Sequence, residues 1–285
     1  MTILFDGIAS GMLLFLISVG LSVTLGLMGF VNLAHGAFAM LGGYLCVTLL
    51  GRAGMPFLWA LPVVALGCAL VGVVFERLLY RRLYGAAHLD QVLFSIGLML
   101  MSIATAVYFF GDQEQPLVLP DYLRGRIAPL GFDVGVYRLF LVVLGLLIAA
   151  ALEWLVRGTR FGARLRAAVD NPRAARGLGI DVDRVFTLAF ALGSGLAGLG
   201  GALGVELLGL DPGFPVKYMV YFLIVVAVGG SGSILGSLAA ALILGVADVA
   251  GKYYLPQFGA FIIYAVMVVA LILRPQGLFG RGHAR

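Results

Sequence analysis

Apolar runs long enough to cross a lipid bilayer recur from one end of this chain to the other. A helix needs about 20 predominantly apolar residues to span the hydrocarbon core, and within it a helix satisfies its own backbone polar groups. The sequence predicts an all-α, polytopic transmembrane helical bundle of about 8–9 spans, forming one domain over residues 1–285. Nine candidate segments are found, at 3–28, 33–50, 57–75, 90–111, 138–156, 184–208, 218–230, 234–250 and 257–273.

The composition excludes a soluble domain and argues against a nucleic-acid-binding protein. Hydrophobic residues make up 62% of the chain and charged residues 12%, with a mean hydropathy of +1.07. The net charge of +5 comes from arginines confined to short connectors, a pattern typical of membrane orientation. Cys46 and Cys68 lie inside apolar runs without ligand spacing, so we expect packing roles for both. Membrane lipid is thus an expected partner, and nucleic acid is not.

Two regions predict one broken or re-entrant element. Glycine and serine at 229–233 interrupt the stretch 218–250, which is therefore either two short spans or one broken helix. Segment 33–50 follows the first span with almost no loop, so it is either a full crossing or a re-entrant or broken element. Segment 3–28 lacks a basic start, so we interpret it as a retained span rather than a cleaved signal.

Arginine placement predicts the orientation of the chain. Arginines gather at 77–82, at 157–184 and at 274–285, whereas the connector 112–136 is mainly acidic. Because cytoplasmic connectors carry an excess of Lys and Arg, the three basic regions and the C-terminus are expected in the cytoplasm. The N-terminus is then expected outside the cell membrane.

The longest basic connector, 157–183, is patterned as two short helices. The first is predicted over 161–170, and Pro172 disfavours helical geometry at Asn171. Asn171 then caps a second helix over 172–178, which Gly177 or Gly179 ends. We interpret the pair as a docking platform, while a loop anchored to anionic lipid is the alternative.

A polar interruption at 29–36 is a candidate ligand-binding segment. Asn32 is placed to cap the following helix, whose free N–H groups could hold an anionic group such as a carboxylate. The alternative is that Asn32 and His35 are hydrogen-bonded packing residues. His35 has no second ligand nearby, so a metal site is not expected.

Other features predict a membrane bundle without enzymatic chemistry of its own. The sequence has no Walker-type loop and no nucleophile and base at recognisable spacing, so no enzymatic activity and no cofactor are expected for this chain. Small residues in 184–208, such as Gly193, Ala197 and Gly201, share one helix face. They predict close helix packing within the chain or, alternatively, a subunit interface.

Three ordered motifs resemble the permease subunits of branched-chain amino-acid ABC importers. These motifs are Gly26–Gly42, Arg166–Ile180 and Gly229–Gly236. The chain is similar to the shorter of the two permeases in such importers, and the resemblance covers almost its whole length. It departs from the wider importer pattern in lacking a Glu before the pair Ala167 and Ala168.

The resemblance implies an inner-membrane importer with several partners. These are a second homologous permease subunit, two cytoplasmic ABC ATPase subunits that use ATP, and a periplasmic solute-binding protein. Importers of urea or short amides and ion-coupled secondary transporters remain alternatives. The residues expected to contact the ATPases are Arg164, Arg166, Asn171, Pro172, Arg173, Ala174, Ala175, Arg176 and Gly179. The residues expected along the translocation pathway are Asn32, His35, Gly36, Gly230, Ser231 and Ser233.

Overall fold

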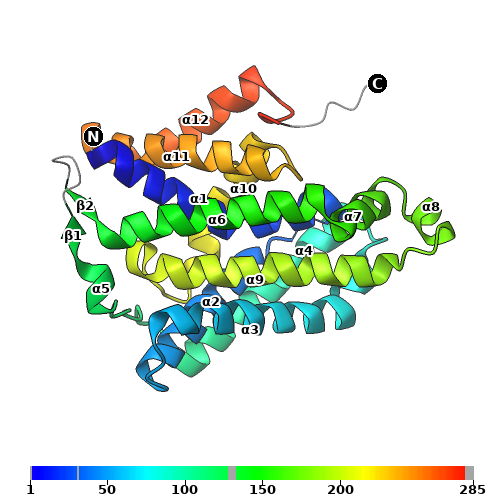
Figure 1. Ribbon diagram of the computed structural model, residues 1–285, viewed down its shortest axis with the longest axis horizontal. Helices are drawn as coiled ribbons and strands as arrows, with labels where there is room; N and C mark the ends of the chain where they lie inside the picture. Colours follow the sequence, from blue (N-terminus) through cyan, green and yellow to red (C-terminus); the bar gives the residue numbers. More distant parts are fainter. Residues whose placement is uncertain (1, 31, 128–132, 280–285) are drawn as a thin grey trace.

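The computed structural model describes residues 2–30, 32–127 and 133–279, and shows a bundle whose long helices lie side by side (Figure 1). In chain order the helical elements are α1 (Thr2–Met28), α2 (His35–Gly51), α3 (Phe57–Leu78), η1 (Tyr80–Leu83), α4 (His88–Phe110), α5 (Asp121–Arg124), α6 (Val136–Gly158), α7 (Arg160–Asp170), α8 (Pro172–Gly177), α9 (Val182–Leu208), α10 (Phe214–Gly229), α11 (Ile234–Tyr254) and α12 (Gly259–Leu273). The all-helical bundle is confirmed, apart from a two-residue antiparallel pairing of β1 (Arg126–Ile127) with β2 (Val134–Gly135).

Six helices among the described residues are long and apolar enough to span a bilayer. They are α1, α3, α4, α6, α9 and α11. The apolar helices α2, α10 and α12 occupy three further predicted segments but have 17, 16 and 15 residues. The count of 8–9 crossings therefore stays a prediction.

The interruption near residue 230 separates two helices and does not break a single one. The helix α10 ends at Gly229, and α11 begins at Ile234 after a tight turn with the Ser233 side chain as its cap. Gly230 ends α10 with a φ of +89°, a conformation that favours glycine. Because α10 and α11 pack against each other beyond this turn, the broken-helix alternative for 218–250 is wrong. The helix α2 is a single unbroken helix. Whether it crosses the bilayer fully or re-enters stays a prediction.

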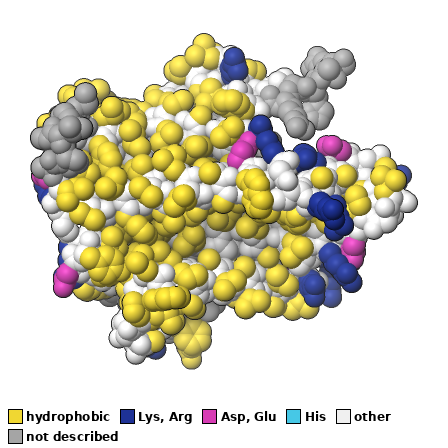
Figure 2. Space-filling view, viewed as in Figure 1, with side chains coloured by type: hydrophobic (Ala, Val, Ile, Leu, Met, Phe, Trp, Pro, Cys, Tyr) yellow, Lys and Arg dark blue, Asp and Glu magenta, His cyan; other side chains and the backbone are white. Residues whose placement is uncertain are grey.

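The basic and acidic connectors lie at opposite ends of the bundle. An ion pair between Arg81 and Asp183 joins two of the arginine-rich regions, and α7 also contacts α1 near the same end. At the other end, Gln115 donates its backbone N–H to the Leu210 carbonyl oxygen at 2.8 Å. Between the two ends the surface is mostly apolar (Figure 2), as expected of a face exposed to lipid.

Backbone contacts at glycines bring the central helices together. The helices α1 and α9 are the two long helices most deeply buried in the bundle. A Cβ atom on Gly200 of α9 would lie 2.8 Å from the Ile17 backbone nitrogen of α1. One on Gly11 of α1 would lie 2.7 Å from the Ala241 carbonyl oxygen of α11. No side chain fits at these crossings, so glycine is required there by space.

The small-residue face of α9 packs inside the chain. Ala197 is fully buried, a Cβ on Gly193 would lie 2.9 Å from the Gly20 carbonyl oxygen, and one on Gly201 would collide with the Ala39 carbonyl group of α2. Of the two alternatives that the sequence left open for this face, packing within the chain is therefore the one observed.

We predict that Gly201→Ala destabilises the bundle by about 1–3 kcal/mol, because α2 must move away from α9 to admit the methyl group. The measurement is the thermal unfolding midpoint of the purified chain in detergent. Gly97→Ala on α4 is the matched control, since a Cβ there meets nothing within 4 Å, and it should leave the midpoint unchanged. Equal midpoints for the two variants would contradict the importance of the α2–α9 crossing.

Candidate functional site

The platform begins where α7 folds back against the end of α6. Thr159 caps α7, and its hydroxyl oxygen accepts a hydrogen bond from the Gly162 N–H at 3.2 Å. A Cβ on Gly162 would collide with the Val156 carbonyl group. Arg166 donates to this same carbonyl oxygen. Arg166, expected at the partner surface, therefore ties α7 to α6 instead, whereas Arg164 is exposed.

The second helix, α8, forms as the local sequence signals predict. The Asn171 side-chain oxygen accepts from the Ala174 N–H at 3.0 Å, and Pro172 occupies the first position of the helix. At the other end Gly179 has a φ of +79°. Ile180 and Gly179 donate their N–H groups to the carbonyl oxygens of Ala175 and Arg176, both at 3.0 Å. This is a Schellman arrangement, which requires glycine at the left-handed position.

A small apolar cluster fixes α8 to its neighbours and corrects the expectation for Ala175. The cluster consists of Leu165, Ala168, Ala175, Val182, Val185 and Ala189. Ala175 is only 2% exposed, so its side chain faces α7 and α9 within this chain. It cannot line a surface for a partner.

The outward face of α8 combines arginine side chains with a small and an apolar residue. Arg173, Ala174 and Arg176 are exposed, and Leu178 is 81% exposed in the turn that ends the helix. Leu178 is not among the contact residues that the sequence predicts. Its position between Gly177 and Gly179 could have indicated its exposure, because residues in turns commonly point away from the packed side.

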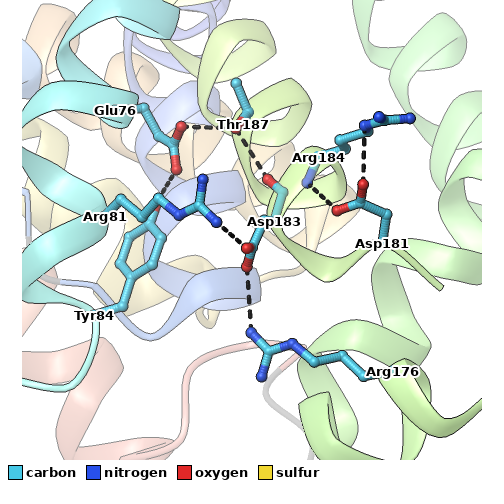
Figure 3. A network of polar contacts seen from close by, with 8 residues as sticks. All are labelled: Glu76, Arg81, Tyr84, Arg176, Asp181, Asp183, Arg184 and Thr187. Atoms are coloured by element: carbon cyan, nitrogen blue, oxygen red, sulfur yellow. Dashed lines mark hydrogen bonds and ion pairs between the residues drawn. The ribbon is translucent and has the colours of Figure 1, made fainter. Parts of the chain in front are cut away.

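A network of ionic and polar contacts joins the platform to α3 and α9 (Figure 3). The Asp183 carboxylate pairs with Arg81 of η1 and with Arg176 of α8, the latter at 3.2 Å. One turn further along α9, Thr187 lies beside Glu76 of α3. The network therefore reaches from the exposed platform to the buried contact between two long helices.

The buried end of this network holds a carboxylate with 0% exposure, Glu76. Its two oxygens accept hydrogen bonds from the Thr187 hydroxyl at 2.7 Å and the Tyr84 hydroxyl at 2.8 Å. Such partners are required because a buried charge without them is costly. Burial, and then the Glu76 carboxylate, raise the pKa of Tyr84, so Tyr84 remains a hydrogen-bond donor. No sequence pattern indicated this group, since its members are distant in the chain.

The first group of predicted pathway residues is buried in the bundle. The Asn32 side-chain oxygen accepts from the Tyr80 hydroxyl at 2.9 Å and from the Ala34 N–H at 3.1 Å. The N-cap of α2 is Ala34, which makes no side-chain cap bond, so the prediction that Asn32 caps this helix is wrong. Asn32 instead closes the turn before it. The His35 Nε2 lies 2.8 Å from the Ile17 carbonyl oxygen, and a Cβ on Gly36 would lie 2.9 Å from the Pro215 Cα.

The second group forms the turn between α10 and α11. Ser231 is exposed, and the Ser233 hydroxyl oxygen accepts from the Gly236 N–H at 3.0 Å. The helix α10 connects the two groups, because Phe222 stands edge-on to the His35 ring and Gly230 follows its last turn. The first group thus contacts α10 from its first turn, at Pro215, to its middle, at Phe222, and the second group follows its last turn. Solute contact stays a prediction for both.

Among the described residues, no three His, Cys, Asp or Glu side chains gather in a way that could hold a metal ion. His35 in particular stands beside a carbonyl oxygen and a phenylalanine ring.

Comparison with known proteins gives a consistent family match. Residues 3–271 match the family described as branched-chain amino acid transport system, permease component. The permease protein BraD of a high-affinity branched-chain amino acid transport system in Pseudomonas aeruginosa is 26% identical, over 98% of this chain and 95% of BraD. The corresponding LivH protein of Escherichia coli K12 is 27% identical, over 98% and 94%. A probable LivH of Methanocaldococcus jannaschii is 28% identical, over 94% and 89%. No solved structure matches significantly.

We predict that Thr187→Val destabilises the chain by about 1–3 kcal/mol, because it leaves one oxygen of the buried Glu76 carboxylate without its donor. The thermal unfolding midpoint in detergent is the measurement. Arg184→Gln serves as the control, since Arg184 pairs with Asp181 on the surface and is 80% exposed. An exposed ion pair contributes about 0–1 kcal/mol, so this variant should unfold near the unsubstituted chain. A smaller effect of Thr187→Val than of Arg184→Gln would contradict the role of the buried contact.

Proposed function

Since the chain belongs to the family of branched-chain amino acid transport system permease components, we propose that it is the transmembrane permease subunit of an ATP-driven importer of branched-chain amino acids. The relatives' printed names support this solute class. The importer would contain a second permease subunit, two cytoplasmic ATPases and a periplasmic binding protein. Neither an ion-coupled transporter nor an importer of urea or amides is favoured by these relatives.

The observation that carries the proposal is a short, doubly capped helix presented at the basic end of an apolar bundle. The helix α8 projects beyond α7 and α9 in Figure 1. Its outward side chains Arg173 and Arg176 suit acidic groups at the rim of a partner groove, and Leu178 suits the groove interior. Ala174 leaves room for a close approach. We propose that this face seats on an ATPase subunit and that the segment 157–183 is the coupling element.

The inward face of α8 connects the platform to the helices of the bundle, so a movement of the platform would reach them. Ala175 packs α8 onto the first turns of α9, and Arg176 pairs with Asp183 of α9. The helix α9 in turn packs against α1, α2 and α3. A rigid displacement of α8 by a partner would therefore move α9 together with the central helices. The Schellman end and the Asn171 cap would keep α8 folded during this movement.

We predict that the permease, reconstituted with its partner subunits and binding protein in lipid vesicles, takes up branched-chain amino acids only when ATP is supplied on the ATPase side. The measurement is accumulation of radiolabelled leucine. An imposed proton or sodium gradient without ATP should give no uptake. Uptake driven by the gradient alone would contradict the proposed class and support the ion-coupled alternative.

We further predict that Ala174→Trp yields a folded, membrane-inserted chain that no longer retains the ATPase, because the indole blocks seating of α8. Co-purification of the ATPase and stimulation of its ATP hydrolysis are the measurements. Ala53→Trp is the matched control, since Ala53 is also exposed and lies in the connector after α2, away from the platform. It should retain the ATPase.

The experiment also tests the alternative that the platform only anchors the chain to anionic lipid. An added indole would not weaken such an anchor, so normal ATPase retention by Ala174→Trp would leave the lipid anchor as the better interpretation. Ala175→Trp is not a suitable test, because its indole would have to enter the apolar cluster beneath α8.

A further inference from the structure

A groove of about 550 Å³ opens between α6 and α11 near the start of α7. Its lining is mostly aliphatic and includes Leu146, Ala149, Ala150, Leu235 and Leu238. The groove exists because α6 and α11 share few contacts while both pack against α1. It belongs to the apolar surface that Figure 2 shows over these helices, where lipid hydrocarbon is the expected solvent.

One end of the groove is polar, and the more exposed of its two charged groups is positive. Glu153 and Arg157 line it there, with the Arg157 Nε 2.5 Å from a Glu153 carboxylate oxygen. The Arg157 side chain remains 69% exposed and that of Glu153 only 22%, so the cation is the more accessible partner. Arg160 and Arg164 are also exposed on α7, directly after the groove. The exposed Arg157 guanidinium, followed in the chain by two further exposed arginines in the first turns of α7, suits an anionic group.

An aromatic side chain marks the level at which the groove passes from apolar to polar. Trp154 lines the groove one turn before Gly158, the last residue of α6, and is 68% exposed. Exposed tryptophan is favoured at the boundary between hydrocarbon and headgroups. The aliphatic part of the groove therefore lies at the depth of acyl chains, and the arginines lie at the depth of headgroups.

We propose that this groove is a binding site for an anionic phospholipid, with one acyl chain along the aliphatic lining and the headgroup phosphate beside Arg157 and the start of α7. The site requires only that the chain sits in a bilayer, so it does not depend on the solute or the ATPase. It assigns Arg157 and Ala150 as lipid-contacting residues. It also differs from a general attraction of the basic platform to lipid, because a shaped apolar groove selects a particular position.

The two tryptophans of the chain allow a direct test. Trp59→Phe leaves Trp154 as the single tryptophan, so its fluorescence reports on lipid in the groove. The full-length variant is placed in phosphatidylcholine bilayers with a small fraction of brominated phosphatidylglycerol or brominated phosphatidylcholine, because bromine quenches tryptophan on contact. We expect the brominated anionic lipid to quench Trp154 roughly fivefold more effectively per mole, as about 1 kcal/mol for one arginine near a headgroup implies.

Two substitutions with matched controls test the two parts of the site. Arg157→Gln should abolish the preference for the anionic lipid, whereas Arg173→Gln on α8, the same change outside the groove, should preserve it. Ala150→Phe should fill the groove and reduce quenching by the anionic lipid to the level of phosphatidylcholine. Ala104→Phe, at an exposed position of α4, should not.

The unsubstituted groove also gives outcomes that would overturn the proposal. Equal quenching by the two brominated lipids would mean that ordinary boundary lipid covers α6 and α11. The absence of quenching by either lipid would mean that a protein surface covers this face. A preference that survives Arg157→Gln would assign the attraction to the basic platform as a whole.

Discussion

The close approach of backbones at glycine crossings is the constraint on which the rest of this structure depends. Inside a membrane, burial of apolar side chains does not drive helices together, because lipid tails are equally apolar. The helices are held together instead by van der Waals contact. Gly11, Gly200 and Gly201 permit this contact, because they have no side chain to separate the backbones of neighbouring helices. The central position of α1 and α9 follows from this requirement, and so does the outer position of helices whose surfaces carry large aliphatic side chains.

The platform depends on the same central helices through a different interaction. Its apolar cluster and the ion pairs of Asp183 attach α8 to the beginning of α9. The buried Glu76 contact then joins α9 to α3 near the edge of the apolar layer. A fully buried carboxylate held by two hydroxyl groups makes the relative position of these helices specific, because any displacement leaves a charge without partners.

The α6–α11 face illustrates how surface features follow from the depth of each element in the bilayer. Both helices pack against α1 but share few contacts with each other, and the space between them is aliphatic along most of its length and lined at one end by Glu153 and Arg157. The charged side chains gather at the two ends of the bundle for the same reason, because water and headgroups replace hydrocarbon there. Arginines at one end attach the platform, and the same arginine-rich composition underlies the predicted orientation and the proposed attraction to phosphate.

By itself the sequence determined the helical membrane fold, the positions of the apolar helices and the two short helices of the platform, with the Asn171 cap of the second. These features depend on signals within a few residues, such as the Asn171 and Pro172 pair or the glycine at 179, and local signals act whatever the neighbouring elements are. Only the tertiary structure decided which side of α8 faces inward, that Arg166 bonds to the end of α6, and that Asn32 bonds to Tyr80 rather than to its own helix. It also brought Glu76, Tyr84 and Thr187 together. The physical reason is that such contacts join residues distant in the chain, so their geometry is set by how whole helices pack and not by the residues beside them.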